Sequence, residues 1–196
     1  MAKKKADKTY GNKLPASAKN IAVGIDQSYS GFGITFMDAD SGNYFTTVFK
    51  GEDLGVNRLV NIWDKLVELM ETHIPEKPKT VVVAMEGYAF GSQMANMAGE
   101  LGAVVKIACL QQLEPYDGKY PYIIPPTVLK KYVTGKGSGI QKNQILLHVF
   151  KNWGVEFNDD NAADSYSLAH LAAGRGTLAH QREIYHNIQD PKYREK

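Results

Sequence analysis

The first fifty residues alternate between short apolar runs and clusters of turn-forming residues. Residues 21–25, 34–37 and 44–49 are apolar, β-branched or aromatic stretches, and each predicts a strand. Residues 38–43, between the last two, read Asp-Ala-Asp-Ser-Gly-Asn, a composition typical of a tight turn. The pattern therefore predicts three antiparallel strands at the start of the domain, the last two forming a hairpin.

From residue 56 the apolar period changes. Residues 56–73 carry apolar side chains at the i, i+3, i+4, i+7 spacing of an amphipathic helix, and prolines follow it. Residues 80–85 form a continuous apolar run, which is the pattern of a strand buried on both faces of a parallel sheet. A second helix is predicted over residues 92–113, where alanines and glycines indicate close packing against a neighbour.

The rest of the chain continues this alternation. A fifth strand is predicted over residues 120–124, and further helices are predicted over residues 127–133, 141–153 and 161–173. Three antiparallel strands followed by helices alternating with strands predict a mixed α/β sheet with helices on both faces.

The two ends of the chain differ from this middle part. Residues 1–19 predict a flexible basic arm, and residues 175–196 predict a basic C-terminal tail. The folded domain is therefore expected to span residues 20–174, which fits one domain of ordinary size.

Composition sets limits on function but does not reveal it. Of 196 residues, 43% are hydrophobic, enough for a packed core. The net charge of +2 does not by itself indicate a nucleic-acid partner. Cys109 is the only cysteine, which excludes an intrachain disulfide and disfavours a zinc cluster; we expect it to be a buried core residue. No apolar run approaches the roughly 20 residues that span a bilayer, and we expect a reducing, cytoplasmic setting and no membrane partner.

Two acidic residues interrupt the apolar pattern where strands end. Asp26 ends the first predicted strand and Glu86 ends the buried fourth strand. An ionised carboxylate is costly there unless a cation meets it, and ligands of α/β sheets bind at the carboxyl ends of strands. Either acid alone is equally well explained as a solvated strand end, whereas two acids favour a shared site.

A third group of acids opens the last apolar helix. Asp159 or Asp160 is expected to cap this helix. Asp164 lies inside the helix and shares a face with Asn161 and Asp160. Oxygen ligands from two strands and one helix suit a hard cation such as Mg²⁺ or Mn²⁺. Two such ions would clamp the attacking and leaving oxygens of a phosphodiester.

Four lysines lie close together in the segment that precedes this helix. They alternate with glycines at 135, 137 and 139, and they are Lys130, Lys131, Lys136 and Lys142. Such glycines let backbone N–H groups approach a phosphate that lysines neutralise. The spacing is not that of a P-loop. The alternative is an ordinary solvated loop.

Two aromatic residues, Tyr88 and Phe90, directly follow Glu86. Aromatic side chains in this place would stack on unpaired bases of a nucleic acid, or they would be ordinary core side chains. The sequence leaves both interpretations open.

Together these motifs resemble those of RuvC-type Holliday-junction resolvases of the ribonuclease H-like superfamily. In chain order they are Gly-Ile-Asp-Gln-Ser at residues 24–28 with Gly31 and Gly33, Met-Glu-Gly-Tyr at 85–88, the lysine-bearing segment 126–145, and Asn-Ala-Ala-Asp at 161–164. The resemblance covers residues 20–173 and implies a ribonuclease H-like fold with a mixed five-stranded sheet. It also implies a homodimer that cuts four-way and other branched DNA symmetrically, with two Mg²⁺ ions per site that Mn²⁺ can replace.

The resemblance assigns roles to individual residues. It implies catalytic roles for Asp26, Glu86, Asp160 and Asp164, metal binding by these four and Asn161, and DNA binding by Tyr88, Phe90 and the four lysines, Lys130 and Lys142 foremost. This chain departs from the family in two places. Asn161 stands where the family has an acid or a histidine, so either Asn161 is itself a ligand or Asp160 supplies the charge. The glycine loop is also about one residue longer.

Three other functions would use some of the same features. A ribonuclease H would use the same acids on an RNA–DNA hybrid, but the lysine-bearing segment fits a resolvase better. An actin-like ATPase needs two such domains, which 196 residues cannot hold. A non-catalytic module that binds branched DNA would have no use for three buried acids.

Overall fold

The computed structural model describes residues 6–87 and 95–194. Within them, six strands form one sheet in the order β1-β4-β3-β2-β5-β6. The strands are β1 (Lys8–Gly11), β2 (Asn20–Asp26), β3 (Phe32–Asp38), β4 (Tyr44–Phe49), β5 (Thr80–Glu86) and β6 (Tyr122–Ile124). The pairs β1–β4, β4–β3 and β3–β2 are antiparallel, whereas the pairs β2–β5 and β5–β6 are parallel.

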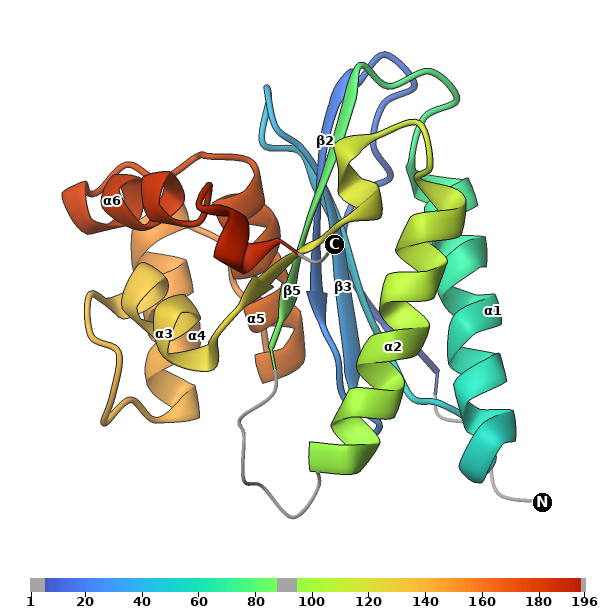
Figure 1. The fold of residues 1–196 in the computed structure, drawn as a ribbon. Helices are drawn as coiled ribbons and strands as arrows, with labels where there is room; N and C mark the ends of the chain where they lie inside the picture. Colours follow the sequence, from blue (N-terminus) through green and yellow to red (C-terminus); the bar gives the residue numbers. More distant parts are fainter. Residues whose placement is uncertain (1–5, 88–94, 195–196) are drawn as a thin grey trace.

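Helices cover both faces of this sheet (Figure 1). The helices are α1 (Gly55–His73), α2 (Ala95–Gln112), α3 (Pro126–Thr134), α4 (Lys142–Trp153), α5 (Asp160–Ala172) and α6 (Ala179–Asn187), with 3-10 turns at Asp117–Lys119 and Pro191–Tyr193. Helices α1 and α2 pack side by side on one face, and α3 to α6 cover the other. Each face has its own core of buried apolar side chains.

The ten predicted helices and strands are confirmed in the described residues, with shifts of only a few residues at their ends, while residues 92–94 of the second predicted helix lie outside the described ranges. The mixed α/β architecture is confirmed as well. Cys109 is buried as expected, and burial raises the pKa of its thiol to about 12. No helix in the described ranges has the length and apolar character needed to cross a membrane.

The sheet differs from the prediction by one strand. Residues 8–11, expected to be part of a flexible arm, form the edge strand β1. Tyr10 packs edge-on against Phe157, with ring centroids 5.0 Å apart, and its hydroxyl donates to Asn158 Oδ1 at 2.5 Å. Leu14, farther along the same segment, is buried in the core. These partners lie far away in sequence, so local periodicity could not reveal the strand.

The C-terminal segment is also more ordered than a basic tail. Ile184 of α6 and Ile188 directly after it are buried against the second core. Gln181 is fully buried, and its Nε2 donates to the carbonyl of Tyr132 at 3.2 Å. The guanidinium of Arg194 lies 4.0 Å from the ring centroid of Tyr122. This segment therefore packs beside α3 and β6, the far edge of the sheet.

Candidate active site

Strand pairing brings Asp26 and Glu86 side by side. Strands β2 and β5 are parallel neighbours in a register that pairs Ile25 with Met85, so the two acids follow at adjacent carboxyl ends. Asp26 is buried and Glu86 is partly buried. The two carboxyl groups are close enough that the charge of Glu86 raises the pKa of Asp26.

Two glycines allow α5 to approach these strand ends. A Cβ atom on Gly24 of β2 would lie 2.0 Å from the carbonyl oxygen of Ser165. A Cβ atom on Gly33 of β3 would lie 2.3 Å from the carbonyl oxygen of Asn161. The Ser165 hydroxyl also shares a buried hydrogen bond with Thr35 at 3.0 Å. Because Gly33 pairs with Asp26 across β2 and β3, the first turn of α5 lies next to Asp26.

The acids of the two strands and the helix form one electrostatic cluster. The pKa of Asp26 is raised well above its ordinary value, first because burial removes the carboxylate from water. Glu86 and Asp164 raise it further by repulsion, as do the hydrogen bond from Glu86 and the charge of Asp160. The structure thus brings together the four acids that the sequence predicted as catalytic.

The start of α5 resolves which acid caps the helix. Asp159 is the N-cap, and its Oδ1 accepts from the backbone N–H of Asn161 at 3.0 Å. The same oxygen accepts from Asn161 Nδ2 at 3.1 Å. Asp160 and Asn161 are therefore both residues of the first helical turn, and neither is needed as a cap.

The donor set fits a hard divalent cation. Carboxylate and amide oxygens are the ligands that Mg²⁺ and Mn²⁺ prefer, and a cation would offset the repulsion that now raises the pKa of Asp26. As they stand, the His, Cys, Asp and Glu side chains in the described ranges include no group of three or more arranged to hold a metal ion.

The predicted DNA-binding lysines lie on the same side of the sheet as α5. Lys130 and Lys131 belong to α3, which packs against α5. Lys131 and Lys136 are exposed and Lys130 is partly buried. The loop turns at Gly135, whose φ of 79° favours glycine. Lys142 opens α4, and its side chain lies outside what the structure describes.

Tyr88 and Phe90 fall in residues 88–94, outside the described ranges. Base stacking and core packing therefore both stay predictions for these two residues.

Gln27 is a site residue that the sequence analysis missed. Its Nε2 donates to the backbone oxygen of Glu86 at 2.9 Å, which ties the ends of β2 and β5 together. Its Oε1 is buried and has no hydrogen-bond partner among the described residues. A Cβ atom on Gly102 of α2 would lie 3.2 Å from this oxygen. The only signal in the sequence was the position of Gln27 directly after Asp26.

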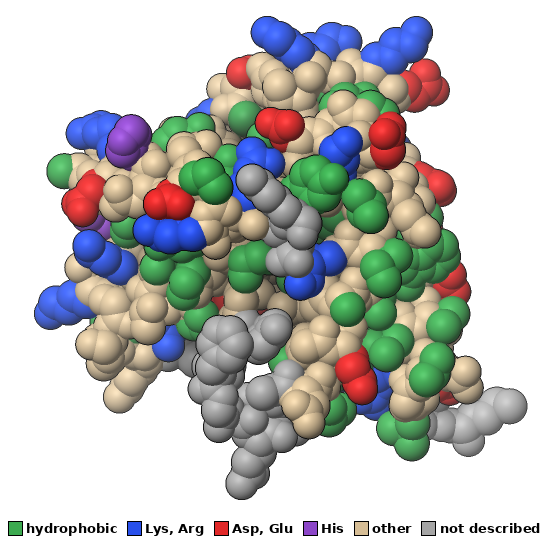
Figure 2. All heavy atoms as spheres, in the orientation of Figure 1, with side chains coloured by type: hydrophobic (Ala, Val, Ile, Leu, Met, Phe, Trp, Pro, Cys, Tyr) green, Lys and Arg blue, Asp and Glu red, His purple; other side chains and the backbone are tan. Residues whose placement is uncertain are grey.

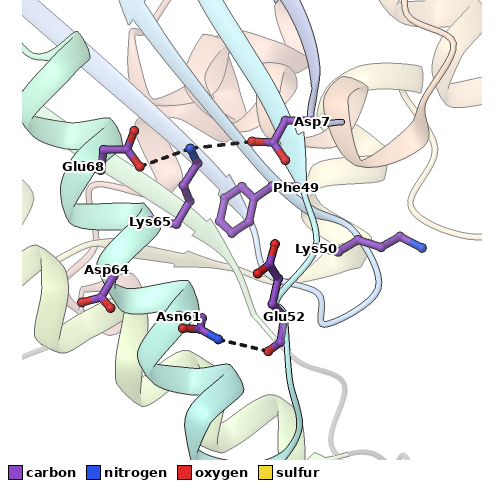
Figure 3. Close-up of a pocket in the computed structure, with 8 residues that line it drawn as sticks. All are labelled: Asp7, Phe49, Lys50, Glu52, Asn61, Asp64, Lys65 and Glu68. Carbon is purple, nitrogen blue, oxygen red and sulfur yellow. Dashed lines mark hydrogen bonds and ion pairs between the residues drawn. The ribbon is translucent and has the colours of Figure 1, made fainter. Parts of the chain in front are cut away.

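Pockets lie on both sides of the residues that lead into β1. One, of about 310 Å³, is lined by Asp7, Phe49, Lys50, Glu52, Asn61, Asp64, Lys65 and Glu68 (Figure 3). Lys65 Nζ lies 3.7 Å from Asp7 and 3.2 Å from Glu68, so these acids have a cation partner already. The other, of about 220 Å³, reaches Asp159 and Asn161 at the start of α5. The four clustered acids line neither pocket.

Comparison with solved structures identifies the fold. RuvC from Thermus thermophilus superposes with a TM-score of 0.60 over 89% of this chain and 98% of that protein, at 18% identity. The fold is of the RuvC type. T. thermophilus RuvC in complex with a Holliday-junction substrate superposes with a TM-score of 0.61, covering 86% of this chain and 96% of that protein, also at 18% identity. No family model and no curated protein matches the sequence.

Proposed function

We propose that this protein is a metal-dependent endonuclease that resolves four-way DNA junctions. The observation that carries the proposal is the convergence of Asp26, Glu86, Asp160 and Asp164 at one edge of a RuvC-type sheet. The RuvC structure determined with a Holliday-junction substrate supports the choice of substrate. Ionising a carboxyl group as deeply buried as that of Asp26 is costly, and such perturbed groups are typical of functional sites.

The chemistry follows from the donor set. Asp26, Glu86 and Asp164, together with Asp160 or Asn161, would hold the ions. Two bound Mg²⁺ or Mn²⁺ ions supply positive charge at the phosphodiester and lower the pKa of an attacking water. Gln27 holds the backbone of Glu86 beside Asp26. Burial around Asp26 limits competing water, which strengthens its interaction with a cation.

The lysine-bearing segment is proposed to hold the DNA backbone. Lys130 and Lys131 belong to α3, which packs against the acid-bearing helix α5, and Lys136 lies in the glycine loop that follows α3. Lysines neutralise phosphates without reading sequence. Selectivity for a junction then depends on shape and on the spacing of two sites.

A homodimer would provide those two sites. Apolar side chains gather over the α1 and α2 face (Figure 2). On α2, Met97, Ile107 and Leu110 are 40%, 49% and 45% exposed. Val56 and Val60 of α1 are also exposed. A symmetric dimer through this face would match the two-fold symmetry of a four-way junction.

A cleavage assay tests the proposal. A labelled four-way junction, a linear duplex and an RNA–DNA hybrid of equal length are incubated with the protein in Mg²⁺ and in EDTA. We expect symmetric nicks in the junction in Mg²⁺ alone, and unlabelled junction should compete far better than linear duplex. Preferred cutting of the hybrid would indicate a ribonuclease H. Tight junction binding without cleavage in Mg²⁺ or Mn²⁺ would indicate a non-catalytic module.

A further inference from the structure

The N-terminal strand contacts the N-cap of the active-site helix, Asp159, through Lys8. The two oxygens of Asp159 face different partners. Lys8 Nζ of β1 donates to Oδ2 at 2.6 Å. The backbone N–H and the side-chain Nδ2 of Asn161 both donate to Oδ1, at 3.0 and 3.1 Å. Asp159 thus connects β1 to the one neutral residue of the predicted metal-binding set.

These contacts decide which end of the Asn161 carboxamide faces Asp159. An ionised carboxylate can only accept hydrogen bonds, so the NH₂ group must point toward it. Lys8 Nζ, 2.6 Å from Oδ2, forms an ion pair with this carboxylate. With its NH₂ group on Oδ1, Asn161 has its carboxamide oxygen left for another partner. No donor to that oxygen is found among the described residues.

The side-chain amide also lies close to Gly31, in the loop between β2 and β3. A Cβ atom on Gly31 would lie 2.6 Å from Asn161 Nδ2. The absence of a side chain at Gly31 therefore leaves space for the NH₂ group beside Asp159. The Asp159 carboxylate accepts from both the backbone N–H and the side-chain NH₂ of Asn161. The position of this carboxylate therefore sets the position of the Asn161 carboxamide oxygen.

Lys8 is in turn held by strand pairing. Strand β1 pairs with β4 in a register that places Lys8 opposite Val48. Tyr10, two residues later, donates to Asn158 and packs on Phe157. The side chain of Asp159 is 11% exposed and that of Lys8 is 45% exposed. This is a partly desolvated ion pair, which constrains geometry better than a fully exposed one.

We propose that Lys8 and Asp159 are positioning residues, which hold the Asn161 carboxamide so that its oxygen serves as a metal ligand alongside Asp26, Glu86 and Asp164. This inference rests on the proposed function for the identity of the metal site. A neutral oxygen ligand here requires an outer partner that fixes its orientation, as metal ligands generally do. The N-terminal strand supplies that partner.

The test uses the full chain and Mn²⁺ alone as the probe. Three single variants are compared: Lys8→Ala removes the donor, Lys8→Arg keeps a cationic donor, and Lys13→Ala removes a lysine of the same segment that has no contact with Asp159. Mn²⁺ affinity is measured by calorimetry without DNA. Thermal stability, junction affinity in EDTA and single-turnover cleavage at subsaturating Mn²⁺ are measured alongside.

We expect Lys8→Ala to weaken Mn²⁺ binding about 10-fold, the lower end of the effect of losing an outer-shell contact. Cleavage at subsaturating Mn²⁺ should slow, while junction affinity stays unchanged. Lys8→Arg should restore most of the Mn²⁺ affinity, and Lys13→Ala should have no effect. In an Asn161→Ala background, Lys8→Ala should cause no further loss, because both changes remove the same ligand.

Other results would overturn the inference. A lower melting temperature with unchanged Mn²⁺ affinity would make the ion pair merely structural. Weaker junction binding with a shallower salt dependence would make Lys8 a phosphate contact. Junction cleavage with equal Mn²⁺ affinity in all variants would leave the proposed function standing and remove the positioning role. If Lys8→Ala lowers Mn²⁺ affinity only when Asn161 is present, but the protein cuts no junction, the positioning role would stand and the proposed function would be wrong.

Discussion

Gly24 of β2 lies directly against Ser165 of α5, so closely that a Cβ atom on Gly24 would come within 2.0 Å of the Ser165 carbonyl oxygen. The backbone nitrogen of Ala169 would be only 2.3 Å from this Cβ atom. A helix can approach a strand this closely only where the strand carries no side chain. The contact sets how near Asp164 and its neighbours come to Asp26.

The first prediction follows from this contact. Gly24→Ala forces α5 away from β2, and we expect a loss of about 1–3 kcal/mol or more in the free energy of unfolding, as for overpacked cores. Gly99→Ala is the matched control, because a Cβ atom there meets nothing within 4 Å and alanine favours a helix by up to about 1 kcal/mol. Urea unfolding measures both. Equal midpoints for Gly24→Ala and the unmodified protein would contradict the prediction.

The second prediction concerns the stability of the metal-free protein. The pKa of Asp26 is raised by folding, so above its ordinary value of 3.8 the folded state binds more protons than the unfolded state. The free energy of unfolding therefore falls as the pH rises through the window between 3.8 and the raised pKa. Asp26→Asn does not titrate, so in EDTA it should melt higher than the unmodified protein at neutral pH and progressively lose this advantage toward pH 4.

Asp26→Asn should also abolish cleavage while leaving junction binding largely intact, and Glu86→Gln should do the same. Cleavage in Mg²⁺ and melting temperature against pH are the two measurements. A variant that melts lower than the unmodified protein at every pH, or that still cuts at the normal rate, would remove Asp26 from the site.

The third prediction separates the residues of α5. Asp164→Asn should reduce cleavage as strongly as Asp26→Asn, because both acids belong to the same electrostatic cluster. Asn161→Ala should reduce Mn²⁺ affinity and cleavage, whereas Asp160→Ala should have the smaller effect, since Asp160 is the weakest of the charges that raise the pKa of Asp26. Each variant is assayed for cleavage and melting temperature. Normal cleavage in both the Asn161 and the Asp160 variants would leave only three protein ligands.

The fourth prediction concerns the lysines. Lys130→Ala and Lys142→Ala should each weaken junction binding and flatten the dependence of log affinity on log salt by about one unit. Excess enzyme should recover cleavage, because the acids are unchanged. Lys77→Ala is the control, since this exposed lysine precedes β5 at the opposite end of the parallel strands. An unchanged salt dependence in both lysine variants would place the DNA elsewhere.

The fifth prediction concerns His170, which is buried in an aromatic cluster with its ring centroid 4.2 Å from that of Trp153. Burial, helped by the charge of Arg175, lowers the pKa of His170 to about 3. Below pH 6.5 the unfolded state binds the extra proton, so the stability from neutral His170 is lost as the pH falls from 6.5 toward 3.

His170→Phe removes this titration. It also removes the 3.0 Å hydrogen bond to Tyr132, and leaving the buried Tyr132 hydroxyl without a partner costs about 1–3 kcal/mol. The variant should therefore be less stable at pH 7, and the difference in the free energy of unfolding should shrink toward pH 4. Urea unfolding at several pH values measures it. A difference that grows as the pH falls would show that His170 is protonated in the folded state.

The sequence alone determined the helices and strands, whose apolar residues repeat at short range along the chain. Helix and strand periods predicted ten elements, because burying one face of each element imposes a pattern that neighbouring residues share. The same pattern made Asp26 and Glu86 recognisable as candidate site residues, because each is an acid that ends a buried apolar run. Asp164 was recognisable because helical spacing placed it on a face with Asn161.

Only the tertiary structure decided which polar groups meet. Lys8 contacts Asp159, 151 residues away, and residues 8–11 of the predicted flexible arm pair with β4 to form β1. Gln27 and Glu86 meet only because β2 and β5 pair in one register. A hydrogen bond between distant polar side chains leaves no periodic trace in either segment, because each side chain alone is compatible with solvent. The local spacing of apolar residues in the sequence indicates which side chains are buried. Which polar side chains pair depends instead on where the folded backbone places the two partners.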